Sequence, residues 1–178
     1  FDPSKSPLVN YLGVDGKVKI CPSLRDFISA GAAAYEAGGG GYGYNHSYVG
    51  GRADLYGLAA QFSANSLSLN DNKAWCLSKF AMFADCAIPS GSSIVEESFI
   101  YPPFWQLNPD PNPISNIPTD PTVHFRHNAR ANVIWCDGHA TREQMSFTTP
   151  SNAYGGDNVK YNVGWFGPRV ENAFWKSE

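Results

Sequence analysis

The stretch from Phe125 to Ala140, FRHNARANVIWCDGHA, decides more of the fold than any other part of the chain. Within it, residues 132–136 form a short apolar run with β-branched side chains, which favours a β-strand. Asp137-Gly138 follows, and this dipeptide is a strong signal for a two-residue type I′ turn, in which both central residues have positive φ. We therefore expect residues 139–147 to return as the partner strand of a hairpin.

The hairpin carries large apolar side chains, so it needs a larger sheet to pack against. The polar residues around it, His127, Asp137 and His139, can form a site only if the chain bends. A straight chain would place His127 and Asp137 roughly 33 Å apart. Residues 128–131 can supply the bend, because asparagine tolerates turn conformations. The alternative is an ordinary β-turn with polar neighbours.

These residues resemble a known family. His127 is followed, after nine residues, by Asp137-Gly138, which is similar to the H-X9-DG signature of prepilin-like (pseudopilin) proteins. Arg126, Asn132 and His139 belong to the same local pattern. Three further elements occur in the order that the family shows, namely Cys21-Pro22-Ser23, Tyr42-Gly43-Tyr44-Asn45 and Phe83-Ala84-Asp85. The resemblance covers residues 21–140, about two-thirds of the chain.

The resemblance implies a non-enzymatic, pilin-like subunit of a type II secretion or pilus-like assembly. It implies an α+β fold in which an antiparallel β-sheet packs on a long hydrophobic N-terminal helix. The implied partners are other pilin-like subunits and, through that helix, the membrane. The implied location is the cell envelope, with an inner-membrane anchor and a periplasmic or extracellular globular domain. Because the chain begins abruptly at Phe1-Asp2-Pro3, we expect it to be the soluble portion of such a protein, with most of that helix absent.

The composition predicts a single folded domain over residues 1–178. Hydrophobic residues make up 43% of the chain and charged residues 16%, the latter below the ~25% usual for globular domains. A net charge of −3 offers no basic surface for nucleic acid. No apolar run reaches the ~18 residues that a membrane-spanning helix needs. The 17 glycines and 13 prolines indicate short strands and long irregular loops.

The cysteines leave two interpretations open. Four are present, at Cys21, Cys76, Cys86 and Cys136, without the Cys-x-x-Cys spacing of a zinc knuckle. An extracytoplasmic location would permit disulfides, in any of three full pairings. Buried free thiols are the alternative, since free cysteine behaves as a small hydrophobic residue.

Two regular elements are expected before the hairpin. Residues 23–37 have apolar side chains at helical spacing, with Ser23 as the N-cap, and predict a helix. Residues 75–87 carry apolar side chains on both faces and predict a central strand. Asp85 ends this strand, and a buried carboxylate needs a partner. Arg126 and His127 are the expected partners, and a solvated strand end is the alternative.

The run from Tyr42 to Val49 is expected to be a strand. Alternate side chains of a strand share a face, so Tyr42, Tyr44, His46 and Tyr48 would form an aromatic stripe. Such a stripe can bind sugar or peptide, which gives an alternative function as an extracytoplasmic carbohydrate- or peptide-binding module. Half-buried β packing, in which tyrosine is common, is the other interpretation.

Two long loops and two short elements are expected elsewhere. Residues 88–122 contain eight prolines and predict a long irregular loop with extended or polyproline II geometry. Residues 148–158 predict a polar, glycine-rich loop. Residues 55–64 suggest a short helix, and residues 159–166 suggest a last strand.

The sequence contains no hydrolase, metalloprotease or dinucleotide-binding motif, so we assign no catalytic residue. His127, Asp137, His139 and Asp85 are the residues for a tentative metal site, because their side chains suit zinc or another transition metal. Calcium would need several oxygen ligands, and only Asp71 and Asp157 lie in suitable loops. No other cofactor is expected.

Overall fold

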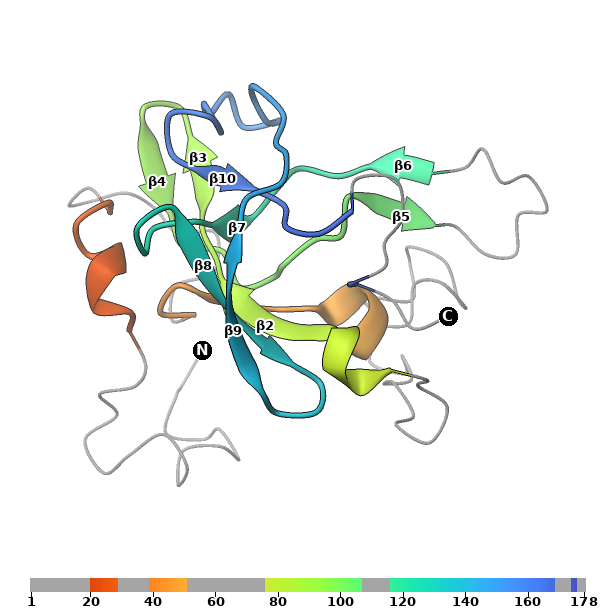
Figure 1. The fold of residues 1–178 in the computed structure, drawn as a ribbon. Helices are drawn as coiled ribbons and strands as arrows, with labels where there is room; N and C mark the ends of the chain where they lie inside the picture. Colours follow the sequence, from red (N-terminus) through yellow and green to blue (C-terminus); the bar gives the residue numbers. More distant parts are fainter. Residues whose placement is uncertain (1–19, 29–38, 51–75, 107–115, 169–173, 176–178) are drawn as a thin grey trace.

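The computed structural model describes residues 20–28, 39–50, 76–106, 116–168 and 174–175. This part of the chain is mostly antiparallel β-sheet with little helix (Figure 1). The main sheet has four strands in the order β1-β2-β8-β9. Their bounds are Tyr42–Tyr44 for β1, Ala81–Asp85 for β2, Arg130–Trp135 for β8 and Ala140–Gln144 for β9. The expected antiparallel sheet is therefore present.

Three two-stranded ladders accompany the main sheet. They pair β3 (Ile88–Ser90) with β4 (Ser93–Val95), β5 (Phe104–Gln106) with β6 (Asn116–Pro118), and β7 (Val123–His124) with β10 (Val163–Gly164). Figure 1 shows the β3–β4 and β5–β6 hairpins extending from the main sheet in different directions. The helical segments of the described residues are 3-10 turns at Pro22–Leu24 and Leu77–Lys79 and a π-helix at His46–Gly50. None of these has the length and hydrophobicity that a membrane span requires.

The expected β8–β9 hairpin is confirmed, but its turn differs from the prediction. Trp135 N donates to His139 O at 3.0 Å and Gly138 N donates to Trp135 O at 2.9 Å. Gly138 has a φ of 89°, whereas Asp137 is not among the residues with positive φ. The loop therefore has three residues and ends in a left-handed bulge, instead of the two-residue type I′ turn. Asp137 Oδ1 accepts from His139 N at 3.1 Å, a local bond that stabilises this longer loop.

A type I′ geometry occurs instead at the other end of β8. Asn128 and Ala129 have φ values of 53° and 57°. The residues on either side exchange backbone hydrogen bonds, with His127 N to Arg130 O at 2.9 Å and Arg130 N to His127 O at 3.2 Å. This turn is the bend expected within residues 128–131, and it reverses the chain immediately before β8.

β2 is a central strand, as expected, although it is shorter than the predicted run. It lies between β1 and β8, and the register shifts between Ala81 and Phe83. The 3-10 turn Leu77–Lys79 occupies part of the predicted strand. Since the side chains of a strand alternate, Ala84 faces the core, together with its partner Val133 on β8.

The helix expected over residues 23–37 is wrong where the structure describes it. A 3-10 turn covers Pro22–Leu24, and Ile28 forms a β-bridge with Ile94. Cys21, not Ser23, is the N-cap residue of that turn, and no side chain caps it. One tight turn is enough to bury Leu24, the residue that this segment contributes to a small core. Residues 29–37 and the predicted helix at 55–64 lie outside the described part of the chain.

The proline-rich region 88–122 is also more regular than expected. It contains two antiparallel hairpins, and Pro89 and Pro118 lie within strands. Proline lacks a backbone N–H, but two-stranded ladders consist of edge strands, where one missing donor is tolerated. Residues 107–115 lie outside the described ranges.

The main core lies under one face of the four-stranded sheet. Its largest members are aromatic, and the cluster includes Phe80, Phe125, Trp135, Trp165, Phe166 and Trp175. Most of the last strand predicted over residues 159–166 is turn. β10 covers only Val163–Gly164, and Trp165 bridges to Phe147.

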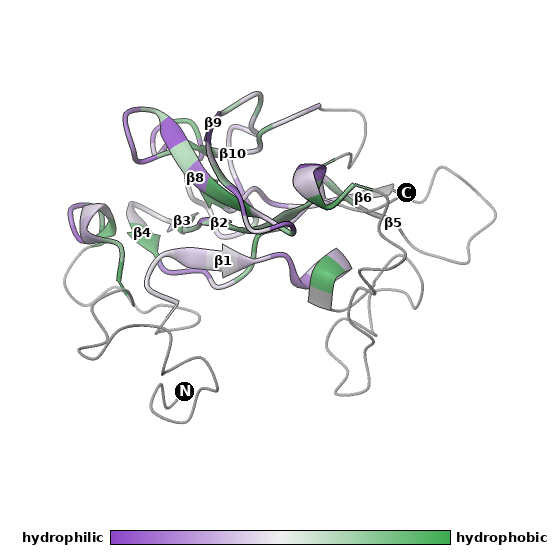
Figure 2. Ribbon diagram, turned by 60° about the horizontal axis from the view of Figure 1, so that its bottom comes forward, coloured by the Kyte–Doolittle hydropathy of each residue, from purple (hydrophilic) through white to green (hydrophobic). Residues whose placement is uncertain are grey.

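A row of apolar side chains crosses three strands of the sheet on the face opposite the buried Val133 and Trp135, and its member at the edge, Tyr44, also packs against the main core. Tyr44 on β1 pairs with Phe83 on β2, and Phe83 pairs with Ile134 on β8. The rings of Tyr44 and Phe83 are 5.0 Å apart, and Ile134 is 37% exposed. Figure 2 shows β1 along one edge of this sheet, leading into the π-helix. We call Tyr44, Phe83 and Ile134 the outer row.

Two buried asparagines hold the loop predicted over residues 148–158. Asn152 Nδ2 donates to Pro89 O at 2.8 Å and to Asn158 Oδ1 at 3.1 Å. Asn152 Oδ1 accepts from two backbone amides, those of Tyr154 and Gly156. The loop is polar because these side chains replace regular backbone pairing.

Candidate functional site

Asp85 and Arg126 form a buried ion pair at the end of β2. Arg126 Nη2 donates to Asp85 Oδ1 at 2.7 Å, and both side chains are fully buried. Asp85 is the last residue of β2, and Arg126 lies in the turn that precedes β8. A buried carboxylate is stable only with a charged or hydrogen-bonding partner. The contact confirms Arg126 as a partner of Asp85, as expected from the sequence.

The second carboxylate oxygen of Asp85 also has partners. Asn132 N, on the adjacent strand β8, donates to Oδ2 at 2.6 Å, and His127 Nε2 lies 3.3 Å from the same oxygen. Both predicted partners, Arg126 and His127, therefore contact Asp85. Hydrogen bonds to an ionised carboxylate are short and stronger than neutral ones, so the carboxylate is held at both oxygens.

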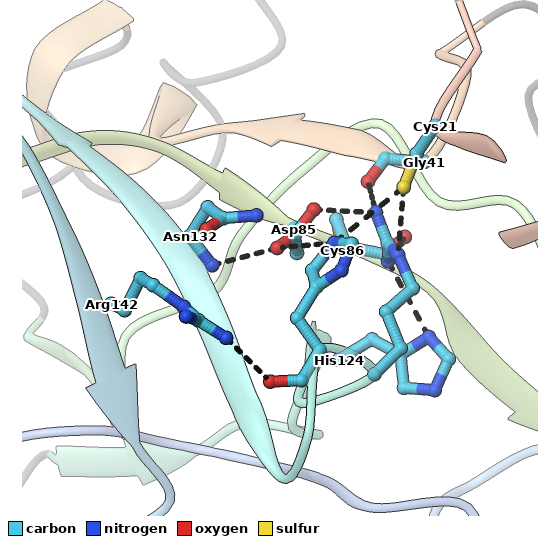
Figure 3. Close-up of polar contacts among 9 residues, drawn as sticks. Cys21, Gly41, Asp85, Cys86, His124, Asn132 and Arg142 are labelled. Atoms are coloured by element: carbon cyan, nitrogen blue, oxygen red, sulfur yellow. Dashed lines mark hydrogen bonds and ion pairs between the residues drawn. The ribbon is translucent and has the colours of Figure 1, made fainter. Parts of the chain in front are cut away.

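The remaining donors of Arg126 reach two further chain segments and the residue next to Asp85 (Figure 3). Nη2 donates to Gly41 O at 2.6 Å, Nη1 to Cys86 O at 3.4 Å, and Nε to Cys21 Sγ at 3.3 Å. The planar guanidinium suits this role, because its five N–H groups point in fixed directions. We call this arrangement the Asp85–Arg126 clamp, and its members are Cys21, Gly41, Asp85, Arg126, His127 and Asn132.

Gly41 is a glycine because the clamp closes against its backbone. Its φ is +86°, and a Cβ there would lie 2.5 Å from Leu24 Cδ2 and 3.0 Å from Arg126 Nη2. Any side chain would push the guanidinium away from the Gly41 carbonyl, and the backbone conformation favours glycine as well.

The Tyr42-Gly43-Tyr44-Asn45 element has structural roles in this fold. A Cβ on Gly43 would lie 2.7 Å from both Cβ and Sγ of Cys86, so only glycine lets β1 approach that side chain. Asn45 Nδ2 donates to Ala81 O and to Trp175 O, both at 2.9 Å. Asn45 thereby joins the end of β1 to β2 and to the C-terminal part of the chain.

His124 supports the clamp from the side of β7. Its Nδ1 accepts from Arg126 Nη1 at 3.4 Å, and Phe27 packs edge-on against its ring at 4.9 Å between centroids. Burial lowers the pKa of His124 to about 3, and the charges of Arg126 and His127 contribute to the shift. At neutral pH the imidazole is therefore uncharged, which leaves Nδ1 free to accept from the guanidinium.

The tentative metal site of His127, Asp137, His139 and Asp85 is not formed. Asp137 and His139 lie on the loop after β8 and pair with each other, with Nδ1 and Oδ1 2.5 Å apart. Hydrogen bonding to His139 lowers the pKa of Asp137. His127 precedes β8, whose six residues separate the two ends of the strand by roughly 20 Å. The bend before β8 turns His127 toward Asp85 instead.

Cys21 joins Asp85 and His127 in place of the two hairpin residues. Among the described residues, these three are the group of metal-ligating side chains whose ligand atoms lie within 4.8 Å of one another. The same atom of His127, Nε2, faces Cys21 Sγ at 3.6 Å and Asp85 Oδ2 at 3.3 Å. A nucleophilic Cys-His relay needs the orienting carboxylate on the other ring nitrogen, so this geometry does not form one.

The aromatic stripe of Tyr42, Tyr44, His46 and Tyr48 is a wrong prediction. β1 ends at Tyr44, and a π-helix begins at His46. Tyr42 is 39% exposed, whereas His46 and Tyr48 are buried, so the four side chains do not line one face. The chain leaves the strand at Asn45, whose amide is directed into the molecule.

All four cysteines are free thiols, which answers the question that the sequence left open. Burial raises the pKa of the Cys86 thiol well above its usual value, and Cys86 Sγ donates to Phe99 O at 3.2 Å. Burial, followed by the charge of Asp137, raises the pKa of Cys136 to about 11. Both thiols are therefore protonated at neutral pH and behave as small hydrophobic groups.

The sequence analysis missed His124, Gly41 and the contact of Cys21 with Asp85 and His127. A weak signal existed for two of them. Gly41 ends a run of four glycines, and His124 lies two residues before Arg126 in the sequence. Cys21 belongs to an element singled out by the family resemblance, but nothing local to residue 21 indicates which side chains it meets.

No family model, curated protein or solved structure matches this chain. The proposals below therefore rest on the contacts of the described residues and on the resemblance carried by the four sequence elements.

Proposed function

We propose that this chain is the extracytoplasmic domain of a pilin-like structural subunit, part of a type II secretion or pilus-like assembly. In this proposal the subunit is non-enzymatic, is anchored in the inner membrane by an apolar helix, and contacts other pilin-like subunits in the cell envelope. One observation carries the proposal. Residues from three of the four sequence elements that resemble the family meet in the Asp85–Arg126 clamp, where they hold the fold together.

Each of these elements contributes a contact with a structural purpose. Cys21 accepts a hydrogen bond from Arg126, and Asp85 binds both Arg126 and the backbone of Asn132. Gly41, the residue before the Tyr42–Asn45 element, also accepts from Arg126. The positive charge of Arg126 balances the negative charge of Asp85 within this buried ion pair. Sequence elements with such roles identify a fold and not a catalytic reaction. This is expected in a family whose members share a structural scaffold for assembly.

The outer row supports the proposed packing of the sheet on a helix. Tyr44, Phe83 and Ile134 lie side by side on three adjacent strands, and Ile134 remains 37% exposed. Apolar side chains aligned across a sheet face are suited to bury the apolar side of a helix. The α+β, pilin-like fold class is proposed on this basis, with the described sheet as its β layer.

Site-specific photocrosslinking tests the proposal in the protein expressed from its native gene in its own cell envelope. A photoreactive amino acid replaces Ile134 in the outer row, and the matched control replaces Val159, an exposed apolar residue in a loop, 57% exposed. We expect the protein in the inner-membrane fraction, with crosslinks from position 134 to an apolar helix of a pilin-like subunit. Position 159 should give few of them.

Two results would overturn the proposal. One is a protein that fractionates away from membranes and gives no crosslink from position 134. The other is specific binding of a glycan or peptide that Tyr42→Ala abolishes, which would favour the binding module instead.

A further inference from the structure

We propose that Cys21, Asp85 and His127 bind a divalent transition metal ion, zinc above all, as a structural site that joins three distant segments of the chain. This inference does not depend on the proposed function, because the ligands belong to the described domain itself. The three side chains supply a thiolate, a carboxylate and an imidazole, which are the ligand types that zinc uses in proteins.

The spacing of the ligand atoms fits a tetrahedral ion. Zn–S bonds of ~2.3 Å and Zn–N bonds of ~2.0 Å place a tetrahedral sulfur and nitrogen about 3.6 Å apart, and a nitrogen and oxygen about 3.4 Å apart. Cys21 Sγ and His127 Nε2 are 3.6 Å apart, and His127 Nε2 and Asp85 Oδ2 are 3.3 Å apart. All three atoms lie within 4.8 Å of one another, so two of the three ligand pairs already have tetrahedral spacing and the third is within reach.

The surrounding groups hold the ligands in place, since Arg126 Nε donates to Cys21 Sγ at 3.3 Å and Asn132 N donates to Asp85 Oδ2 at 2.6 Å. Arg126 Nη2 binds Asp85 Oδ1, which leaves Oδ2 directed toward His127. Arg142 Nη2 donates to His127 O at 3.3 Å and fixes the backbone of that ligand. In known metal sites, partners of this kind orient the side chains that bind the ion directly, and they affect metal affinity.

The charges and the access path also suit a divalent cation. A Cys21 thiolate and the Asp85 carboxylate carry two negative charges, and Arg126 compensates one of them. In the ion-free site the Arg126 guanidinium balances the Asp85 carboxylate, and the Cys21 thiolate adds its negative charge when the ion binds. The thiol proton passes to solvent as the sulfur–metal bond forms. The His127 side chain is 23% exposed while Asp85 is fully buried, so the ion reaches the site from the side of His127.

The test uses untagged protein, freed of metal with a chelator and then titrated with Zn²⁺ or Co²⁺. Cobalt reports on the ligands, because a thiolate ligand gives charge-transfer absorption and tetrahedral geometry gives intense visible bands. We expect one ion per chain with both spectroscopic features. Cys21→Ser should abolish the charge-transfer band, and His127→Gln should weaken affinity by at least about tenfold.

Matched controls keep the result specific. Cys76 is an exposed free thiol and His139 lies on the hairpin loop, so Cys76→Ser and His139→Gln should bind cobalt like the unmodified protein. Circular dichroism of each metal-free variant verifies that it is folded. The proposal is overturned if the folded wild-type protein gives no thiolate–cobalt band, or if Cys76→Ser removes the band while Cys21→Ser retains it. Neither outcome bears on the crosslinking test of the proposed function.

Discussion

Asp85 occupies a position where a charge is costly unless its partners are complete. Its carboxylate is fully buried, and transferring an ionised group from water into the interior costs several kcal/mol even after relaxation. Arg126, Asn132 and His127 together supply the compensating contacts. Removing one partner would leave an uncompensated buried charge, so the contacts of this residue act as a unit.

His124 predicts how stability depends on pH. Its pKa falls from 6.5 to about 3 on folding, so the unfolded chain binds a proton that the folded chain rejects. The stability linked to His124 is therefore present above pH 6.5 and is lost as the pH falls toward 3, with a slope approaching about 1.4 kcal/mol per pH unit. Urea unfolding over this pH range measures the slope.

His124→Gln should reduce that slope by the amount that corresponds to one bound proton, because glutamine does not titrate in this pH range. Val159→Ala is the control and should retain the wild-type slope, since Val159 is exposed and carries no ionisable group. An identical slope in wild type and His124→Gln would show that another group causes the acid sensitivity.

The close packing around Gly43 predicts that no larger residue fits at this position of the Tyr-Gly-Tyr-Asn element. A Cβ atom at this position would lie 2.7 Å from Cβ and Sγ of Cys86 and 2.9 Å from Ile100 Cγ2. Gly43→Ala should therefore lower the free energy of unfolding by about 1–3 kcal/mol, the usual cost of overpacking a core. Urea denaturation checks this value, and an unchanged midpoint would mean that β1 is not held against Cys86 as described.

The β8–β9 hairpin shows which local signals are sufficient and which are not. The apolar, partly β-branched run 132–136 and the Asp137-Gly138 dipeptide predict both strands, because hairpins are governed by neighbouring residues. The turn type was wrong because the bond from His139 N to the Asp137 side chain favours a longer loop. The type I′ conformation falls on Asn128-Ala129, where the sequence has no glycine to indicate it.

The two turns at the ends of β8 predict that an alanine-to-glycine substitution in one turn stabilises the fold and that a glycine-to-alanine substitution in the other destabilises it. Ala129 has a φ of 57° and Gly138 a φ of 89°, and a left-handed conformation is costly for alanine but not for glycine. Ala129→Gly should raise the free energy of unfolding by about 0.5–1 kcal/mol. Gly138→Ala should lower it by about 1–2 kcal/mol, because nothing within 4 Å of its Cβ adds a steric effect. Urea midpoints of both variants test the signs, and two shifts of the same sign would contradict the assignment of the turns.

The errors elsewhere have a common physical origin. Residues 23–28 have helical spacing, and Tyr42 to Tyr48 alternate as in a strand, but contacts from distant segments override both patterns. Leu24 is buried by a single 3-10 turn, and Tyr48 enters the core from a π-helix. Prolines at 89 and 118 do not prevent strands, because their ladders have only two members.

Considering the molecule as a whole, the clamp brings together segments that are far apart in the sequence. The pairing of Asp85 with Arg126 could be predicted, because a buried carboxylate at the end of a strand needs a charged or hydrogen-bonding partner. The place of Cys21 could not, since it is 105 residues from Arg126 and no local pattern encodes such a contact. The same limit explains why Asp137 and His139 were wrongly grouped with His127.

The core, the outer row and the clamp occupy different parts of the described domain. The aromatic core lies under one face of the sheet, the outer row lies on the other, and the clamp closes one end of β2. A metal ion at Cys21, Asp85 and His127 would strengthen that end, while the outer row would serve the proposed assembly. Both proposals require the ion pair to hold the fold in its described form.

A double-mutant cycle on that ion pair tests the requirement most directly. The free energies of unfolding of wild type, Asp85→Asn, Arg126→Met and the double variant are measured in urea. We predict that each single substitution costs about 3–5 kcal/mol, and that the double variant is about as stable as either single variant or more so, giving a coupling well above 1 kcal/mol. Additive losses, agreeing within about 0.5 kcal/mol, would show that the two residues do not act as a pair and would contradict the account.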